Sequence, residues 1–121
     1  MRHESVVIYH NSHCSKSRAA CEFLAAQGIT PEVIDYLKTP PSKEQLRELL
    51  NKLGMKPAEL IRRGEETFKT HYSGKTMGDE DWLDALVAYP ILIERPIVVS
   101  GNRAVIGRPL EKVLALLGED D

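Results

Sequence analysis

The stretch that decides the fold is residues 6–18, VVIYHNSHCSKSR. An apolar, largely β-branched run ends there in a polar turn, and a pattern typical of a helix begins directly after Cys14. Strand, turn and helix would place Cys14 where the first backbone N–H groups of a helix lack partners within the helix. Those donors and the helix dipole stabilise an anion. We therefore expect the pKa of Cys14 to lie below the ~8.5 of a free cysteine.

Basic residues flank this cysteine on both sides. Arg18 follows one helical turn later on the same predicted face, and Lys16 and His10 lie close by in the sequence. A cysteine that merely opens a helix is usually a small apolar residue, whereas one among cationic groups is typical of a reactive thiolate. We interpret Cys14 as a reactive, partly exposed thiolate.

Composition narrows the class of protein. The 121 residues suffice for one domain with a sizeable core, and the net charge of -2 gives no general attraction to nucleic acid or to an anionic membrane. No apolar run approaches the ~20 residues of a membrane-spanning helix. We expect no signal peptide, because the first predicted strand begins within the first few residues. Two cysteines do not make a disulfide scaffold, so we expect a cytoplasmic protein.

The remaining patterns predict an α/β fold. Further strands are expected at residues 31–37, 97–99 and 104–106. A helical block of about residues 42–89 separates the second strand from the third; Ser42 and Gln45 form a capping box there, and Asp79 is expected to cap the last helix. The order β-α-β, helices, β-β-α predicts a mixed four-stranded sheet flanked by helices. We expect residues 1–121 to form one domain with the block as an insertion.

A dithiol redox motif is a first alternative for Cys14. It needs a second cysteine three residues later, where this chain has Ser17. Cys21 lies seven residues along the same helix, which separates the two Cα atoms by ~10.5 Å and exceeds the ~7 Å limit of a disulfide. We therefore expect Cys21 to be a small core residue beside Leu24, and an external thiol to resolve any oxidised Cys14.

Two other kinds of site fit the pattern less well. A phosphate-binding loop of a cysteine phosphatase would need arginine at the position of Ala20. A metal site of His10, His13 and Cys14 matches no strong zinc spacing, and no second ligand pair follows, so no metal is expected. Arginines remain as candidate anion ligands, because the guanidinium fork suits tetrahedral oxyanions, but their spacing alone does not favour one over another. These are Arg62, Arg63, Arg95 and Arg108.

The chain resembles the glutaredoxin-coupled arsenate reductases over about residues 5–117. The family pattern His-x3-Cys-x3-Arg stands here as His10, Cys14 and Arg18. Three further segments match family loops, at residues 36–42, 90–99 and 107–109. One local difference is Ser12, where the family commonly has proline.

The resemblance implies a thioredoxin-like fold with a helical insertion and a cis bond before Pro96. It implies that Cys14 attacks arsenate and that His10 tunes the thiolate. Ser17 stands where a resolving cysteine would be, so glutathione would resolve the adduct and glutaredoxin would remove the glutathionyl group, with no tightly bound cofactor. The family's three anion-binding arginines fall on Arg62, Arg95 and Arg108.

Two other functions stay open. A redox-responsive regulator of the Spx type, which binds RNA polymerase, has a similar fold but usually carries the cysteine pair that this chain lacks. A glutathione-linked thiol oxidoreductase acting on another oxidised substrate would need the same Cys14 chemistry. The sequence does not separate arsenate from such substrates.

Overall fold

The computed structural model describes residues 6–11, 13–107 and 111–118. The chain forms two compact units, which we call the sheet unit (residues 1–39 and 95–121) and the helical unit (residues 40–94). The helical unit thus interrupts the sheet unit between its second and third strands. That the whole chain behaves as one domain with an insertion stays a prediction. No helix among the described residues is long and apolar enough to cross a membrane.

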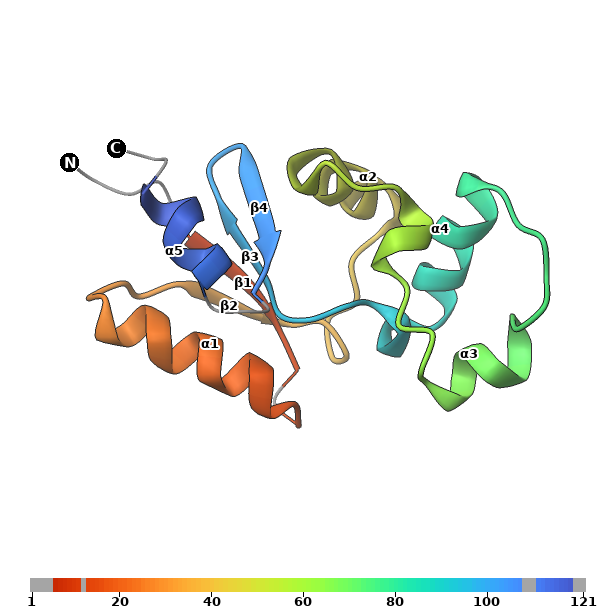
Figure 1. The fold of residues 1–121 in the computed structure, drawn as a ribbon, viewed down its shortest axis with the longest axis horizontal. Coiled ribbons are helices and arrows are strands. Elements are labelled where there is room, and N and C mark those ends of the chain that lie inside the picture. The colour runs from red at the N-terminus through yellow and green to blue at the C-terminus, as the bar shows by residue number, and fades with distance from the viewer. Residues whose placement is uncertain (1–5, 12, 108–110, 119–121) are drawn as a thin grey trace. The chain divides into compact units, whose positions relative to one another are not determined.

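The sheet unit contains the mixed four-stranded sheet that the sequence predicts. Its strand order is β2-β1-β3-β4, with β1 parallel to β2 and antiparallel to β3, and β3 antiparallel to β4 (Figure 1). The strands are β1 (Val6–His10), β2 (Glu32–Asp35), β3 (Ile97–Ser100) and β4 (Arg103–Ile106). In the register Ile8 lies between Val33 on β2 and Val98 on β3. The carboxyl end of the central strand β1, and the turn that follows it, therefore lie at one end of the strands.

The core of the sheet unit lies between the sheet and two helices, α1 (Ser15–Ala26) and α5 (Glu111–Gly118). Alternate positions of β1 point to these helices, because side chains of a strand alternate between its two faces. Buried residues from all these elements form one cluster: Val6, Ile8, Ala20, Leu24, Val98, Val113, Leu116 and Leu117. Cys21 packs against this cluster and is half-buried, which agrees with the core position expected for it.

The turn between β3 and β4 uses one residue of positive φ. Gly101 has φ of +60°, whereas no non-glycine residue in the described part of the chain has a positive φ. In the two-residue turn of Gly101 and Asn102, only Gly101 therefore has a positive φ. A turn with glycine at the first central position alone is the type II′ pattern, whose twist also matches that of a hairpin.

The helical unit contains α2 (Lys43–Leu53), α3 (Glu66–His71) and α4 (Asp79–Ala88), with 3-10 turns η1 (Pro57–Leu60) and η2 (Pro90–Leu92). The predicted capping box is present: Gln45 N–H donates to Ser42 Oγ at 3.1 Å, and Ser42 N–H donates to Gln45 Oε1 at 2.8 Å. The predicted cap at Asp79 is wrong. Gly78 is the N-cap residue of α4, and Asp81 Oδ2 accepts its N–H at 3.0 Å.

Candidate functional site: a thiolate at the start of helix α1

Asn11 organises the turn that joins β1 to α1. Its backbone carbonyl accepts the Cys14 N–H at 2.9 Å, and its Oδ1 accepts the His13 N–H at 2.9 Å. Its own N–H donates to Ser17 Oγ at 3.3 Å. Asn11 is 3% exposed and Ser17 is fully buried. These three bonds connect the strand, the turn and the helix, so they determine where Cys14 lies.

Sequence reasoning missed Asn11. The signal was present, since an asparagine that directly follows a strand commonly bonds the backbone two residues on. Ser17, in contrast, was singled out as the position of an absent second thiol. In the structure the Ser17 hydroxyl oxygen accepts the Asn11 N–H and so stabilises the turn.

Cys14 is the N-cap residue of α1 and is half-exposed. Partial burial raises the pKa of its thiol, but three groups more than reverse that effect. The backbone N–H of Ser17, the side chain of Arg95 and the backbone N–H of Lys16 hydrogen-bond the sulfur, and together they lower the pKa of Cys14 to about 7. The lowering that the sequence predicts for a helix-start cysteine is confirmed.

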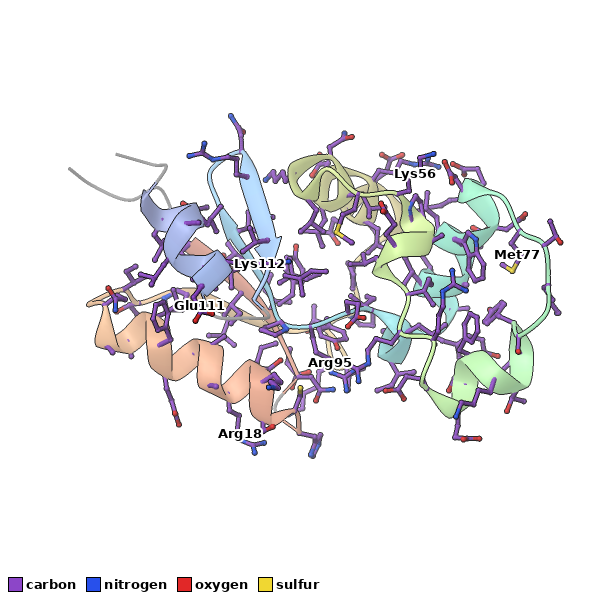
Figure 2. The ribbon with its side chains drawn as sticks, viewed as in Figure 1. Arg18, Lys56, Met77, Arg95, Glu111 and Lys112 are labelled. Atoms are coloured by element: carbon purple, nitrogen blue, oxygen red, sulfur yellow. The ribbon has the colours of Figure 1, made fainter. Side chains whose placement is uncertain are left out.

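Arg95 is the charged side chain that contacts the sulfur. It lies two residues before β3, is only 8% exposed, and forms a cis peptide bond with Pro96, as the family resemblance implies. Figure 2 shows its side chain near the start of α1, where it hydrogen-bonds Cys14. A guanidinium presents several N–H donors in one plane, so Arg95 can bond a thiolate and an oxyanion attached to it.

The structure places the other predicted residues of this region differently. Arg18 is exposed on the first turn of α1 and bonds the Cys14 carbonyl through its backbone N–H at 3.1 Å (Figure 2). The groups that lower the pKa of Cys14 are backbone donors and Arg95, not the Arg18 guanidinium. His10, half-buried at the end of β1, directs its Nδ1 to Cys21 Sγ at 3.8 Å.

Arg62 belongs to the helical unit, whereas the Cys14 turn belongs to the sheet unit. Its Nε lies 3.3 Å from Glu65 Oε2, and its Nη1 lies 3.7 Å from Glu94 Oε1. The Nη1 atom is buried and makes no hydrogen bond to any described residue. Arg108 and Ser12 lie outside the described residues. No group of three or more potential metal ligands is found in the part of the chain that the structure describes.

The fold and this turn define a class of protein: a thioredoxin-like α/β fold with a cysteine of lowered pKa at the start of its first helix. The model of the ArsC family matches residues 9–116, and the chain belongs to this family. The predicted family and fold are confirmed.

Relatives and solved structures agree with this assignment. A protein of Escherichia coli strain K12, uncharacterized protein YfgD, is 44% identical over 95% of this chain and 98% of its own length. An arsenate reductase of Neisseria meningitidis serogroup A is 40% identical over 93% of this chain and 97% of its own. The structure of an arsenate reductase from Vibrio cholerae is 45% identical, superposes with a TM-score of 0.90, and covers 96% of this chain and 100% of its own.

Proposed function

We propose that the protein is an arsenate reductase that uses glutathione and glutaredoxin. The observation that carries the proposal is the half-exposed Cys14, whose pKa is about 7. Much of this cysteine is therefore a thiolate at neutral pH, and the Arg95 guanidinium hydrogen-bonds its sulfur. Relatives that cover nearly the whole chain at 40% identity are named arsenate reductase. Membership of the ArsC family supports a small-molecule substrate and a redox partner.

The first step is attack by the Cys14 thiolate on arsenic. A sulfur–arsenic bond forms, and one arsenate oxygen leaves as water after protonation. Negative charge on the remaining oxygens is stabilised by N–H groups at the start of α1 and by Arg95, groups that are already in place before the reaction. The same donors that stabilise the thiolate can therefore stabilise the adduct.

The remaining steps supply two electrons. Glutathione adds to the arsenic of the adduct, and a second water leaves. A glutaredoxin thiolate then attacks the glutathione sulfur; a mixed disulfide forms, and the electron pair of the broken sulfur–arsenic bond reduces As(V) to As(III). Hydrolysis of the Cys14–arsenic bond releases arsenite and restores the thiol. External thiols are needed because Ser17 cannot form a disulfide with Cys14.

Arg62 and Arg108 are proposed as further anion ligands, following the family pattern, and His10 and Arg18 as supporting residues of the Cys14 turn. Arg62 is proposed from the family pattern alone, because its guanidinium lies beside the carboxylates of Glu65 and Glu94. What supports Arg95 is its bond to the Cys14 sulfur.

The test is a coupled assay with purified protein, glutathione, glutaredoxin, glutathione reductase and NADPH. Arsenate should cause NADPH oxidation, and omission of glutaredoxin should nearly stop it. Phosphate and sulfate should compete weakly without being reduced, because thiols do not reduce them. If arsenate gives no glutaredoxin-dependent turnover while Cys14 still accepts a glutathionyl group, the protein is a thiol oxidoreductase for another substrate. If no thiol chemistry occurs and RNA polymerase is captured, the regulator hypothesis is correct.

A further inference from the structure

Cys21 contacts one side chain of the candidate site. It lies two helical turns after Cys14 on α1, and its Sγ is 3.8 Å from His10 Nδ1, within the distance of a sulfur hydrogen bond. Both residues are half-buried, and Cys21 also packs against the core cluster of the sheet unit. The last residue of β1 is thus held against the helix that carries Cys14.

The direction of this hydrogen bond depends on the tautomer of His10 and on whether Cys21 has a proton to donate. Burial and the nearby Glu22 carboxylate raise the pKa of Cys21, so at neutral pH this residue is a thiol. Where this thiol donates its one proton, the ring nitrogen that receives it is unprotonated; the opposite tautomer would donate its Nδ1–H to the sulfur. In a neutral His10 the ring proton then resides on Nε2.

We propose that Cys21 is a positioning residue: its S–H holds the neutral His10 ring against α1 as the Nε2–H tautomer. The ring then offers an N–H donor, rather than a lone pair, to a second partner. A donor attracts a thiolate or an oxyanion, whereas the lone pair of the opposite tautomer would repel it. The contribution to catalysis rests on the proposed function, but the tautomer itself does not.

An apolar residue at position 21 would fill the same space without this effect. Alanine or valine can pack against the core cluster but cannot donate to Nδ1, and serine can donate with a shorter reach. This difference separates a positioning role from simple packing.

The first experiment measures the ring directly. Two-bond 1H–15N correlation spectra of the full-length protein at pH 8, with the His10 signals assigned through His10→Gln, report which nitrogen carries the proton. The wild type should show Nε2–H with Nδ1 accepting a hydrogen bond. In Cys21→Val, which places an apolar side chain with no donor at this position, the Nδ1 signal should move toward that of a free acceptor, and the share of the Nδ1–H tautomer should rise. Unchanged His10 signals in a folded Cys21→Val protein would overturn the proposal.

A second variant covers the case in which Cys21→Val does not fold. Cys21→Ser is smaller and retains a donor, so its His10 signals should lie between those of the wild type and those of Cys21→Ala. Equal signals in the serine and alanine variants would show that the donor has no effect, and would overturn the proposal.

The kinetic experiment connects the tautomer to the reaction. Cys21→Val should lower kcat/KM for arsenate by about three- to tenfold, and His10→Gln should cost little more in the Cys21→Val protein than Cys21→Val costs alone. Losses that simply multiply would overturn the positioning role in catalysis. If the wild type does not reduce arsenate but its His10 responds to Cys21→Val, the proposed function fails and the tautomer assignment stands.

Discussion

The sheet unit and the helical unit begin their helices in different ways. In the helical unit, α2 and α4 have carboxylate or amide oxygens that bond the N-cap backbone, from Gln45 and Asp81. In the sheet unit, α1 begins at Cys14, and the N–H groups of Lys16 and Ser17 bond its sulfur. The same physical requirement, to satisfy the first N–H groups of a helix, yields stability in one unit and a reactive anion in the other.

Charged residues show the same contrast. On α2 and α4, exposed ion pairs join Lys43 and Arg47 to Glu80 and Asp84. Such exposed pairs contribute little to stability, because water and salt screen them. In the sheet unit Arg95 is buried against a sulfur that has a proton to lose. A charge therefore has chemical consequences where it is buried beside a titratable group.

Replacing the sulfur tests this comparison most severely. Cys14→Ser should abolish arsenate reduction, because a serine hydroxyl is neither a thiolate nor able to form the adduct. The free energy of unfolding should hardly fall, since serine is a favourable N-cap residue in the extended conformation found at Cys14. The coupled assay and urea denaturation measure the two quantities. A variant that keeps a tenth of the activity would contradict the assignment of Cys14 as nucleophile.

Removing the guanidinium should have the next largest effect. Arg95→Ala should raise the pKa of Cys14, since it removes the side-chain donor and positive charge that lower it. It should reduce kcat/KM by about ten- to a thousandfold, as expected for loss of ~1.5–4 kcal/mol of transition-state stabilisation. Arg95→Lys should restore only part of the loss. Arg103→Ala removes an exposed arginine of the same unit and should leave both quantities near wild type; an equal loss in that control would show a general charge effect.

The pH dependence of Cys14 follows from its lowered pKa. Alkylation by iodoacetamide should be half-maximal near pH 7, the pKa of about 7 found for Cys14, and should fall about tenfold for each pH unit below it. Because the folded pKa lies below that of the unfolded thiol, the thiolate stabilises the fold above pH ~9 and this contribution is lost as pH falls through ~7. Urea titrations of wild type and Cys14→Ser at several pH values measure it. A constant difference between the two across this range would show that the pKa is not lowered.

A change to the capping box should affect stability alone. Ser42→Ala removes the oxygen that accepts the Gln45 N–H and should cost about 1 kcal/mol of unfolding free energy. Ser42→Asp keeps an acceptor and is the matched control. Cys14 alkylation should be unchanged in both variants. A slower alkylation in Ser42→Ala would show that the helix start of one unit influences the site in the other.

The smallest effect is expected for the exposed ion pairs. Arg47 and Lys43 lower the pKa of Glu80 to about 2, so these pairs persist through neutral pH and are lost only as pH falls toward 2. Glu80→Gln should lower the denaturation midpoint slightly, and high salt should remove the difference because exposed pairs are screened. Glu44→Gln changes a weaker pair, 3.9 Å from Arg47, and should have less effect still. A large loss that persists in high salt would mean that Glu80 has another role.

The sequence by itself determined the features that depend on near neighbours. The strand–turn–helix at residues 6–18, the capping box at Ser42 and the helical block between the strands all follow from patterns within a few residues. The lowered pKa of Cys14 is partly such a local feature, because two of its causes are backbone N–H groups of the next helical turn. The error at Asp79 has the same local character, because the N-cap lies one residue earlier, at Gly78, whose N–H bonds Asp81.

Only the tertiary structure decided which distant groups meet. Arg18 is close to Cys14 in the sequence, yet Arg95 contacts the sulfur, because antiparallel pairing of β3 with β1 brings the segment that leads into β3 to the turn after β1. Likewise, His10 faces Cys21 because α1 packs back along β1. A one-dimensional pattern records spacing along the chain, whereas strand order and register set distances across the sheet. The identity of the guanidinium beside the thiolate was therefore a property of the fold.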